Sequence, residues 1–293
     1  MIYYFLPGRG LFGGVKVAIQ FIGLMSSLGV KIVAVLPDGK APDWFVARAA
    51  VLAEEQVWPR LTADDWLMIT WPPDYPRLKD RGKLVCHCQG TDELMDPIFA
   101  DQNVPILSCW EQADEYVRQA HGRSTLKVGI AISDCFFHDG SIKWDNRVAY
   151  MPRRGWELIK ACMKANRSLD YQPIDGLDEM AVSQCLKQSG LYLATSIGEQ
   201  FGLPALEAMA AGCAVISVPV KGGTEYLRTG FNCLLGQPGE LPELLAWLSE
   251  PAQTELRHLF RARAVATAHN YRLCGQRRRL ARLLEQELSW LRC

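Results

Sequence analysis

Short apolar segments alternate with amphipathic segments along most of the chain, and this alternation constrains the fold more than any other feature. Apolar runs such as IYYFL and KIVAVLP are followed by longer stretches whose apolar residues recur at helical spacing. This order is typical of a parallel sheet with helices on both faces. In the first half the apolar runs do not alternate strictly with polar residues, as expected for strands buried on both sides. We therefore predict an α/β fold with doubly wound, Rossmann-like domains.

The pattern begins twice, which predicts two domains. Strands are expected at MIYYFL, KIVAVLP, WLMITW, KLVCHC and PILSC, and a helix after them closes at Gly122. A second series begins at LKVGIAI. We therefore expect an unusually short N-terminal domain of residues 1–122, a C-terminal domain of residues 123–275, and a C-terminal helix of residues 276–293. A chain of 293 residues is long enough for two such domains, and we expect them to face one another across a cleft.

The C-terminal helix has an apolar stripe opposite the consecutive arginines Arg277–Arg279. The stripe consists of Leu280, Leu283, Leu284, Leu288 and Leu291. Such a stripe usually meets a core, so we expect the helix to pack back on the protein, with the N-terminal domain as its partner. The alternative is a peripheral contact with an anionic membrane.

Composition excludes several classes of protein. Acidic and basic residues balance at 32 each, so no overall field attracts nucleic acid. The start of the chain lacks the pattern of a signal peptide, and no apolar run is long enough to span a membrane. The ten cysteines are scattered, mostly within apolar runs, which is typical of reduced thiols in a cytoplasmic protein. Adjacent Cys86, His87 and Cys88 would point to opposite faces of a strand, so we expect no metal there.

The stretch EQFGLPALEAMAAGCAVISVPVKGG carries the clearest chemical signal. It follows the apolar run LYLAT and predicts a loop and then a helix, with Pro204 at the first helical position and Gly212 at the end. The backbone amides near Phe201, Gly202 and Leu203 would then point outward at the carboxyl edge of the sheet. The start of a helix carries partial positive charge and attracts phosphate.

Two acids flank this helix start, eight positions apart. Glu207, in the first turn, could accept two hydrogen bonds from ribose hydroxyls, and Glu199 could bind hydroxyls beyond the phosphates. This pair suits a nucleotide sugar. Taken alone, the same spacing also fits two acids that only cap a helix.

The residues EQFGLPALEAMAAGCAVISVPVKGGTEYLRTGFNCLL closely resemble the donor-site segment of glycosyltransferase family 4, the group 1 glycosyl transferases. Glu199 and Glu207 occupy the two glutamate positions of the family's E-x7-E motif. Weaker similarity extends to GGVKVAIQFIGLMSSLGVKIVAV and VAYMPRRGWELIKAC. The resemblance implies the GT-B fold and transfer of a sugar from a nucleoside-diphosphate sugar, with retention and without a metal. It also suggests a role in polysaccharide biosynthesis, with an unknown glycan, lipid-linked or small-molecule acceptor.

The resemblance also assigns roles to residues. Glu199 would bind hydroxyls of the donor sugar, and Glu207 would bind those of the ribose. The backbone at Phe201, Gly202 and Leu203 would contact the sugar and diphosphate. From the other domain, the loop at Gly13 and Gly14 would close over the diphosphate.

A basic loop fits the same reaction. Arg153 and Arg154 follow a predicted strand and precede a predicted helix, where they could stabilise the charge of a leaving diphosphate. Arg154 matches one of the family's two basic positions, and Ala149 stands at the other. Two solvated arginines are the alternative interpretation.

Residues at the ends of N-terminal strands are further candidates. His87 and Gln89, in CHCQG, could contact the sugar or diphosphate. A single histidine in an apolar strand is more often a core residue.

Other functions are compatible with this pattern. A nucleotide-sugar epimerase or a non-catalytic nucleotide-sugar-binding protein could share the fold, and a scaffold role could retain it without activity. The complete glutamate pair favours transfer. The balanced charge argues against a DNA-modifying transferase.

Overall fold

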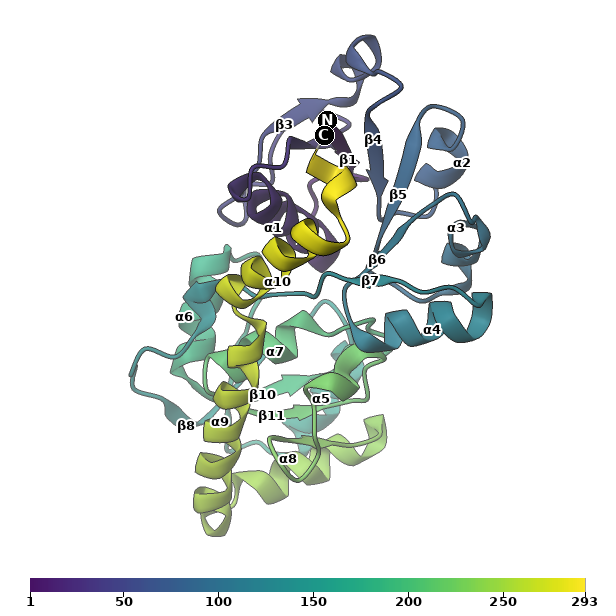
Figure 1. The fold of residues 1–293 in the computed structure, drawn as a ribbon. Helices are drawn as coiled ribbons and strands as arrows, with labels where there is room; N and C mark the ends of the chain where they lie inside the picture. The colour runs from purple at the N-terminus through teal and green to yellow at the C-terminus, as the bar shows by residue number, and fades with distance from the viewer. Residues whose placement is uncertain (293) are drawn as a thin grey trace. The chain divides into compact units, whose positions relative to one another are not determined.

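A computed structural model describes residues 1–292, which form two compact units. One unit contains Met1–Ala131 and the segment that begins at Leu273, and the other contains Ile132–Arg272. Each unit has its own parallel sheet with helices packed on it (Figure 1). This confirms the predicted α/β class with two Rossmann-like domains.

The first unit is built on a seven-stranded parallel sheet in the order β3-β2-β1-β4-β5-β6-β7. Its strands are β1 (Ile2–Phe5), β2 (Ile32–Leu36), β3 (Val51–Ala53), β4 (Trp66–Ile69), β5 (Lys83–Cys88), β6 (Ile106–Ser108) and β7 (Leu126–Lys127). Its α-helices are α1 (Gly13–Ser27), α2 (Asp74–Leu78), α3 (Asp96–Ala100), α4 (Glu111–His121) and α10 (Leu273–Gln286). Short 3-10 helices are η1 (Glu54–Gln56), η2 (Trp58–Arg60), η3 (Glu93–Met95) and η9 (Ser289–Arg292).

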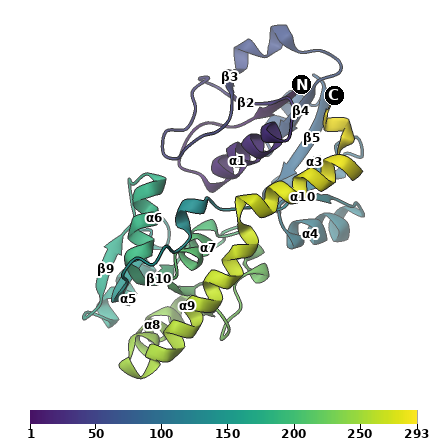
Figure 2. The same cartoon turned by 60° about the vertical axis from the view of Figure 1, so that its left-hand side comes forward.

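Helix α10 completes the core of this unit. Its residues Leu280 and Leu284 are fully buried, in the same apolar cluster as Ile22 of α1, and Leu288 and Leu291 continue the stripe. Figure 2 shows α10, in yellow, beside α1. Four of the five stripe residues are therefore buried in this unit and Leu283 is partly buried, so the stripe packs on protein as expected. None of the helices within residues 1–292 combines the length and apolar character needed to cross a bilayer.

The second unit contains a five-stranded parallel sheet in the order β12-β11-β10-β8-β9. Its strands are β8 (Trp144–Tyr150), β9 (Asp170–Pro173), β10 (Ser189–Ala194), β11 (Ala214–Ser217) and β12 (Cys233–Leu235). Its α-helices are α5 (Trp156–Ala165), α6 (Glu179–Gln188), α7 (Leu203–Ala210), α8 (Leu241–Ser249) and α9 (Thr254–Ala268). Short 3-10 helices are η4 (Asp134–Phe136), η5 (Gly222–Glu225), η6 (Pro238–Glu240), η7 (Pro251–Gln253) and η8 (His269–Tyr271).

The boundaries between the units differ from the predicted ones. The prediction starts a second sheet at LKVGIAI, but Leu126 pairs with Leu107 of β6 and extends the first sheet. The chain passes into the second unit only at Ile132 and leaves it at Arg272, and these two residues form an isolated bridge. An apolar run predicts a strand but does not identify its neighbour, which explains the error.

Candidate functional site

Two loops meet at the carboxyl edge of the second sheet. β8 and β10 are parallel neighbours, with Tyr150 opposite Leu193, so the segments that follow them leave the sheet at the same edge. The hydroxyl of buried Thr195 donates to the carbonyl oxygen of Arg154 at 2.9 Å. Gly155 has a φ of +79°, and a side-chain carbon there would lie 2.3 Å from the carbonyl oxygen of Thr195. The close contact between the loops therefore requires glycine at position 155.

This contact brings together two predicted catalytic residues. Nη1 of Arg154 donates to Oε2 of Glu199 at 2.9 Å. The side chain of Arg154 is 58% exposed and that of Glu199 is 26% exposed, so both can be reached by a ligand. Arg153 instead lies near Asp175, with Nε 3.4 Å from Oδ1. Of the two arginines in the basic loop, only Arg154 contacts Glu199.

Helix α7 begins beside Glu199. Gly202 caps it with a φ of +83°, and Pro204 lies in its first turn. The hydroxyl of Tyr226 is shared between the carbonyl oxygens of Gly202, at 2.6 Å, and Phe201, at 3.0 Å. A side-chain carbon at Gly202 would lie 2.8 Å from that hydroxyl. Glycine thus allows both the turn and the buried tyrosine that supports it, and the amide of Leu203 begins the helix as an N-terminal donor.

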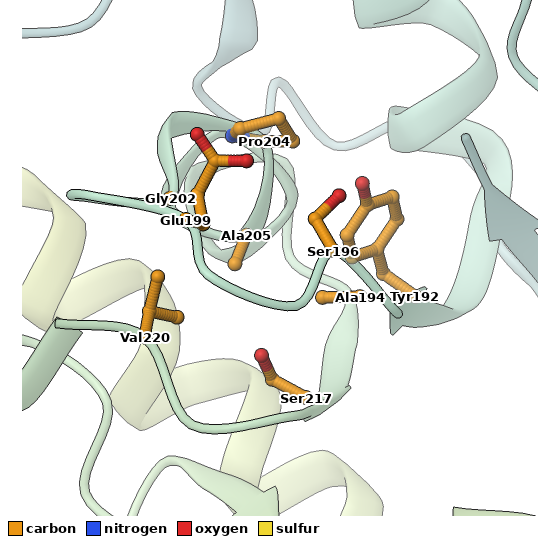
Figure 3. A pocket seen from close by; sticks show the side chains of 9 residues that line it. All are labelled: Tyr192, Ala194, Ser196, Glu199, Gly202, Pro204, Ala205, Ser217 and Val220. Carbon is orange, nitrogen blue, oxygen red and sulfur yellow. The ribbon is translucent and has the colours of Figure 1, made fainter. Parts of the chain in front are cut away.

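A pocket lies at this helix start. The side chains that line it are Tyr192, Ala194, Ser196, Glu199, Gly202, Pro204, Ala205, Ser217 and Val220 (Figure 3). The amide of Lys221 donates to the carbonyl oxygen of Glu199 at 3.2 Å, which holds the segment after β11 against the loop after β10. The pocket is therefore built by segments at the carboxyl ends of β10 and β11 together with the first turn of α7, which is where ligands of open parallel sheets bind.

Both glutamates act electrostatically on one tyrosine of this pocket. Glu207 is 6% exposed and is the fifth residue of α7, just beyond the first turn in which it was predicted, because the helix begins at Leu203. Tyr192 lies in β10. Burial, and after it the charges of neighbouring groups that include Glu207 and Glu199, raise the pKa of Tyr192. Its hydroxyl therefore stays protonated and available as a donor at neutral pH.

In the first unit, the predicted glycine loop lies against a predicted polar residue. Gly13 and Gly14 begin α1. A side-chain carbon at Gly14 would lie 2.9 Å from Oε1 of Gln89. Nε2 of Gln89 also donates to the hydroxyl of Tyr4 at 3.2 Å. Gln89 and the start of α1 are thus neighbours at the carboxyl edge of the first sheet.

The structure places His87 in the core rather than at this edge. Its ring is fully buried, with Nδ1 2.7 Å from the hydroxyl of Tyr4 and Nε2 3.1 Å from Sγ of Cys109. The ring of Phe21 packs on it with centroids 4.5 Å apart. Burial lowers the pKa of His87 to about 3. The predicted ligand contact does not fit this position, because both ring nitrogens face protein groups and the ring has no exposed surface.

Comparison with known proteins adds two findings. Residues 171–264 match the family model described as glycosyl transferases group 1, a segment that includes Glu199 and Glu207. Three similar solved structures cover nearly the whole chain. Anabaena Alr3699/HepE in complex with UDP and glucose is 14% identical, with 97% of this chain and 99% of that chain covered and a TM-score of 0.72. Sucrose-phosphate synthase from Thermosynechococcus elongatus is 12% identical, with 98% of this chain and 99% of that chain covered and a TM-score of 0.74. The pneumococcal O-GlcNAc transferase GtfA in complex with UDP and GlcNAc is 11% identical, with 98% of this chain and 99% of that chain covered and a TM-score of 0.72. The fold is GT-B. A comparison with curated protein sequences finds no match.

The location of Ala149 in this GT-B fold shows where the missing basic residue would lie. It is fully buried in β8, opposite Tyr192 of β10. In the family that the sequence resembles, this position carries the first of two basic residues. Here it lies inside the sheet, one residue before β8 ends. The loop that follows β8 supplies two cationic groups at this edge, Arg153 and Arg154.

Sequence reasoning missed several residues that shape the site. Thr195, Tyr192 and Tyr226 are buried, and each supports or lines the helix start through a contact that depends on the fold. Thr195 is the last residue of the predicted strand LYLAT, and that position was the one available signal.

Proposed function

We propose that this chain transfers a sugar from a nucleoside-diphosphate sugar to an acceptor, without a metal and with retention of the anomeric configuration. The observation that supports this most is the contact of Arg154 with Glu199 beside the start of α7. It places a cation, an acid with accessible oxygens and a helix N-terminus at one sheet edge. The acid and the helix lie within the segment that matches group 1 glycosyl transferases.

The guanidinium of Arg154 could stabilise the negative charge that the proposed reaction produces. As the glycosidic bond breaks, negative charge grows on the leaving diphosphate, and groups already in place stabilise it without reorganisation. We assign this role to Arg154, whose planar guanidinium can bind two phosphate oxygens. The start of α7 at Gly202 and Leu203 adds partial positive charge and backbone donors. Arg153, held near Asp175, would contribute less.

The two acids suit the hydroxyls at either end of the donor. Glu199 lines the pocket, so we assign it to hydroxyls of the donor sugar. Glu207, buried in α7, is assigned to the ribose. From the first unit, we assign contacts with the donor to Gly13, Gly14 and Gln89, which lie together at its sheet edge.

We take a UDP-sugar as the first donor to test, because UDP is bound in the structures of Alr3699/HepE and GtfA. Thermal unfolding is measured with UDP, GDP, ADP and dTDP and with their sugar conjugates, in buffer containing a chelator. A ligand at a hundred times its dissociation constant should stabilise the protein by about 2.7 kcal/mol. The exposed Arg278 of α10 provides a matched control, since R278A should respond to ligand like the wild type.

A donor that raises the midpoint is then assayed for slow hydrolysis, and NMR of the released sugar reports the anomer first formed. Retention and turnover in the chelator are the expected results. Folded protein that responds to no nucleotide would overturn the proposal. Binding without hydrolysis or transfer would leave a nucleotide-sugar-binding protein in place of an enzyme.

A further inference from the structure

We propose that Thr195 is a positioning residue that sets the place of Arg154 relative to Glu199. This inference rests on the proposed function, because it concerns how the cation of that site is held. Thr195 itself is buried beneath the loop, so it acts through Arg154 and touches no donor.

The first evidence is the anchoring of the Arg154 backbone. The hydroxyl of Thr195, 2% exposed, donates to the carbonyl oxygen of Arg154 at 2.9 Å. On the other side of the basic loop, the amides of Leu158 and Ile159 bond to the carbonyl oxygen of Gly155 and start α5. The backbone of Arg154 is therefore held between a helix start and a buried hydroxyl.

The second evidence is that the anchor and the acid lie on the same short segment. Four residues after Thr195, the carboxylate of Glu199 accepts from Nη1 of Arg154. Between them, the side chain of Ile197 is 68% exposed, and a side-chain carbon at Gly198 would meet nothing within 4 Å. Ile197 and Gly198 thus have little packing of their own. Arg154 is thus linked to the segment 195–199 twice, through its backbone to Thr195 and through its side chain to Glu199. The backbone contact fixes the position from which the arginine side chain extends.

This arrangement has a consequence for catalysis. A long, half-exposed arginine loses conformational freedom when it holds a phosphate, and an anchored backbone reduces that cost. Valine is nearly isosteric with threonine but cannot donate. T195V should therefore lower kcat/KM for donor hydrolysis about five- to tenfold, as expected for one positioning hydrogen bond. Most of the loss should fall on kcat, since the charge that Arg154 stabilises grows as the bond breaks.

A double-mutant cycle tests this inference. Donor hydrolysis and UDP affinity are measured for wild type, T195V, R154A and the double variant. If Thr195 acts through Arg154, T195V should cost about five- to tenfold in the wild type but less than about twofold in R154A. T195S keeps the hydroxyl and should restore most of the activity that T195V loses.

Thr267 offers a matched control. It is also buried in the second unit, and its hydroxyl also donates to a backbone carbonyl, that of Arg263 at 2.8 Å. T267V should reduce stability without changing kcat. If T195V does not fold, T195A takes its place in the cycle, with the circular dichroism spectrum checked for each variant.

Two failures are distinguishable. If wild type hydrolyses a donor and R154A is impaired, equal effects of T195V in both backgrounds would overturn this inference alone. If wild type neither binds nor hydrolyses any donor, the proposed function fails and this inference fails with it.

Discussion

The guanidinium of Arg154 donates to the carboxylate of Glu199 across 2.9 Å, which joins the loops after β8 and β10. Each group thus satisfies the other in a partly exposed position. A donor would bring phosphate oxygens to the arginine and hydroxyls to the glutamate. The pair therefore holds both groups near the places where, in the proposed reaction, they would meet different parts of one ligand.

Replacement of Glu199 should separate activity from stability. E199A is expected to lower kcat for transfer or hydrolysis by about a hundredfold, comparable to the loss of one preorganised polar group in other active sites. The free energy of unfolding should change by less than about 1 kcal/mol, because partly exposed ion pairs contribute little. Kinetics and urea unfolding measured on the same preparation check both parts. Full transfer activity in folded E199A would contradict the role of this acid.

The two arginines of the basic loop should differ. R154A is expected to lower kcat by about a hundredfold and to weaken UDP binding, since it removes the guanidinium that contacts Glu199 of the pocket. R154K should recover only part of the loss, because an ammonium lacks the forked geometry of guanidinium. R153A is the matched control and should cost less than about tenfold, since Arg153 lies near Asp175 instead. Calorimetry with UDP and steady-state kinetics compare the three variants, and equal losses in R153A and R154A would contradict the assignment.

Sequence reasoning located the elements of the candidate site well because their signals are local. The strand LYLAT and the loop and helix after it appear as β10, the loop that follows and α7, with Gly212 just after the helix. The helix begins at Leu203, one residue before the predicted first position at Pro204. The assignment of LKVGIAI to the second sheet was wrong because strand pairing depends on contacts far apart in sequence, here Leu107 with Leu126. For the same reason the role of Thr195 could not be predicted, because its hydrogen-bond partner, the backbone of Arg154, is distant in sequence.

Glycine at position 155 should be required for stability through two separable effects. G155A introduces a methyl group 2.3 Å from the carbonyl oxygen of Thr195, and it also strains a φ of +79°. Gly198 has a similar φ of +76°, but the same carbon there would meet nothing within 4 Å. We expect a loss of about 1 kcal/mol for G198A from the backbone alone, and at least about 2 kcal/mol more for G155A. Urea unfolding of both variants measures the difference, and equal losses would show that the loops can separate at little cost.

The C-terminal helix should contribute strongly to the first unit. Leu284 of α10 is fully buried in the same cluster as residues of α1. L284A should lower the free energy of unfolding by about 2–5 kcal/mol, from lost burial and the cavity left behind. The exposed neighbour Arg282 is the control, and R282A should change stability by less than about 0.5 kcal/mol. A small effect of L284A in urea unfolding would show that α10 is dispensable for the core.

His87 should make the first unit sensitive to mildly acidic pH. Its pKa is lowered to about 3 by burial, below the value of about 6.5 expected in the unfolded chain. The unfolded state therefore binds a proton more readily, and stability falls as pH decreases through 6.5 toward 3. Between pH 7 and pH 5 this linkage predicts a loss of about 2 kcal/mol. The neighbouring Tyr4 and Cys109 stay neutral over this range, because burial raises the pKa of each.

The H87Q variant isolates this contribution. It lacks the titrating ring, so its stability should depend less on pH than that of the wild type, whatever its absolute stability. Unfolding of the first unit is followed by hydrogen exchange of the β1 and β5 amides, which report on the sheet that contains Tyr4 and His87. The difference between wild type and H87Q should change by about 2 kcal/mol from pH 7 to pH 5. A difference that stays constant would mean that the imidazole can be protonated within the folded core, and that the ring is less secluded than its contacts indicate.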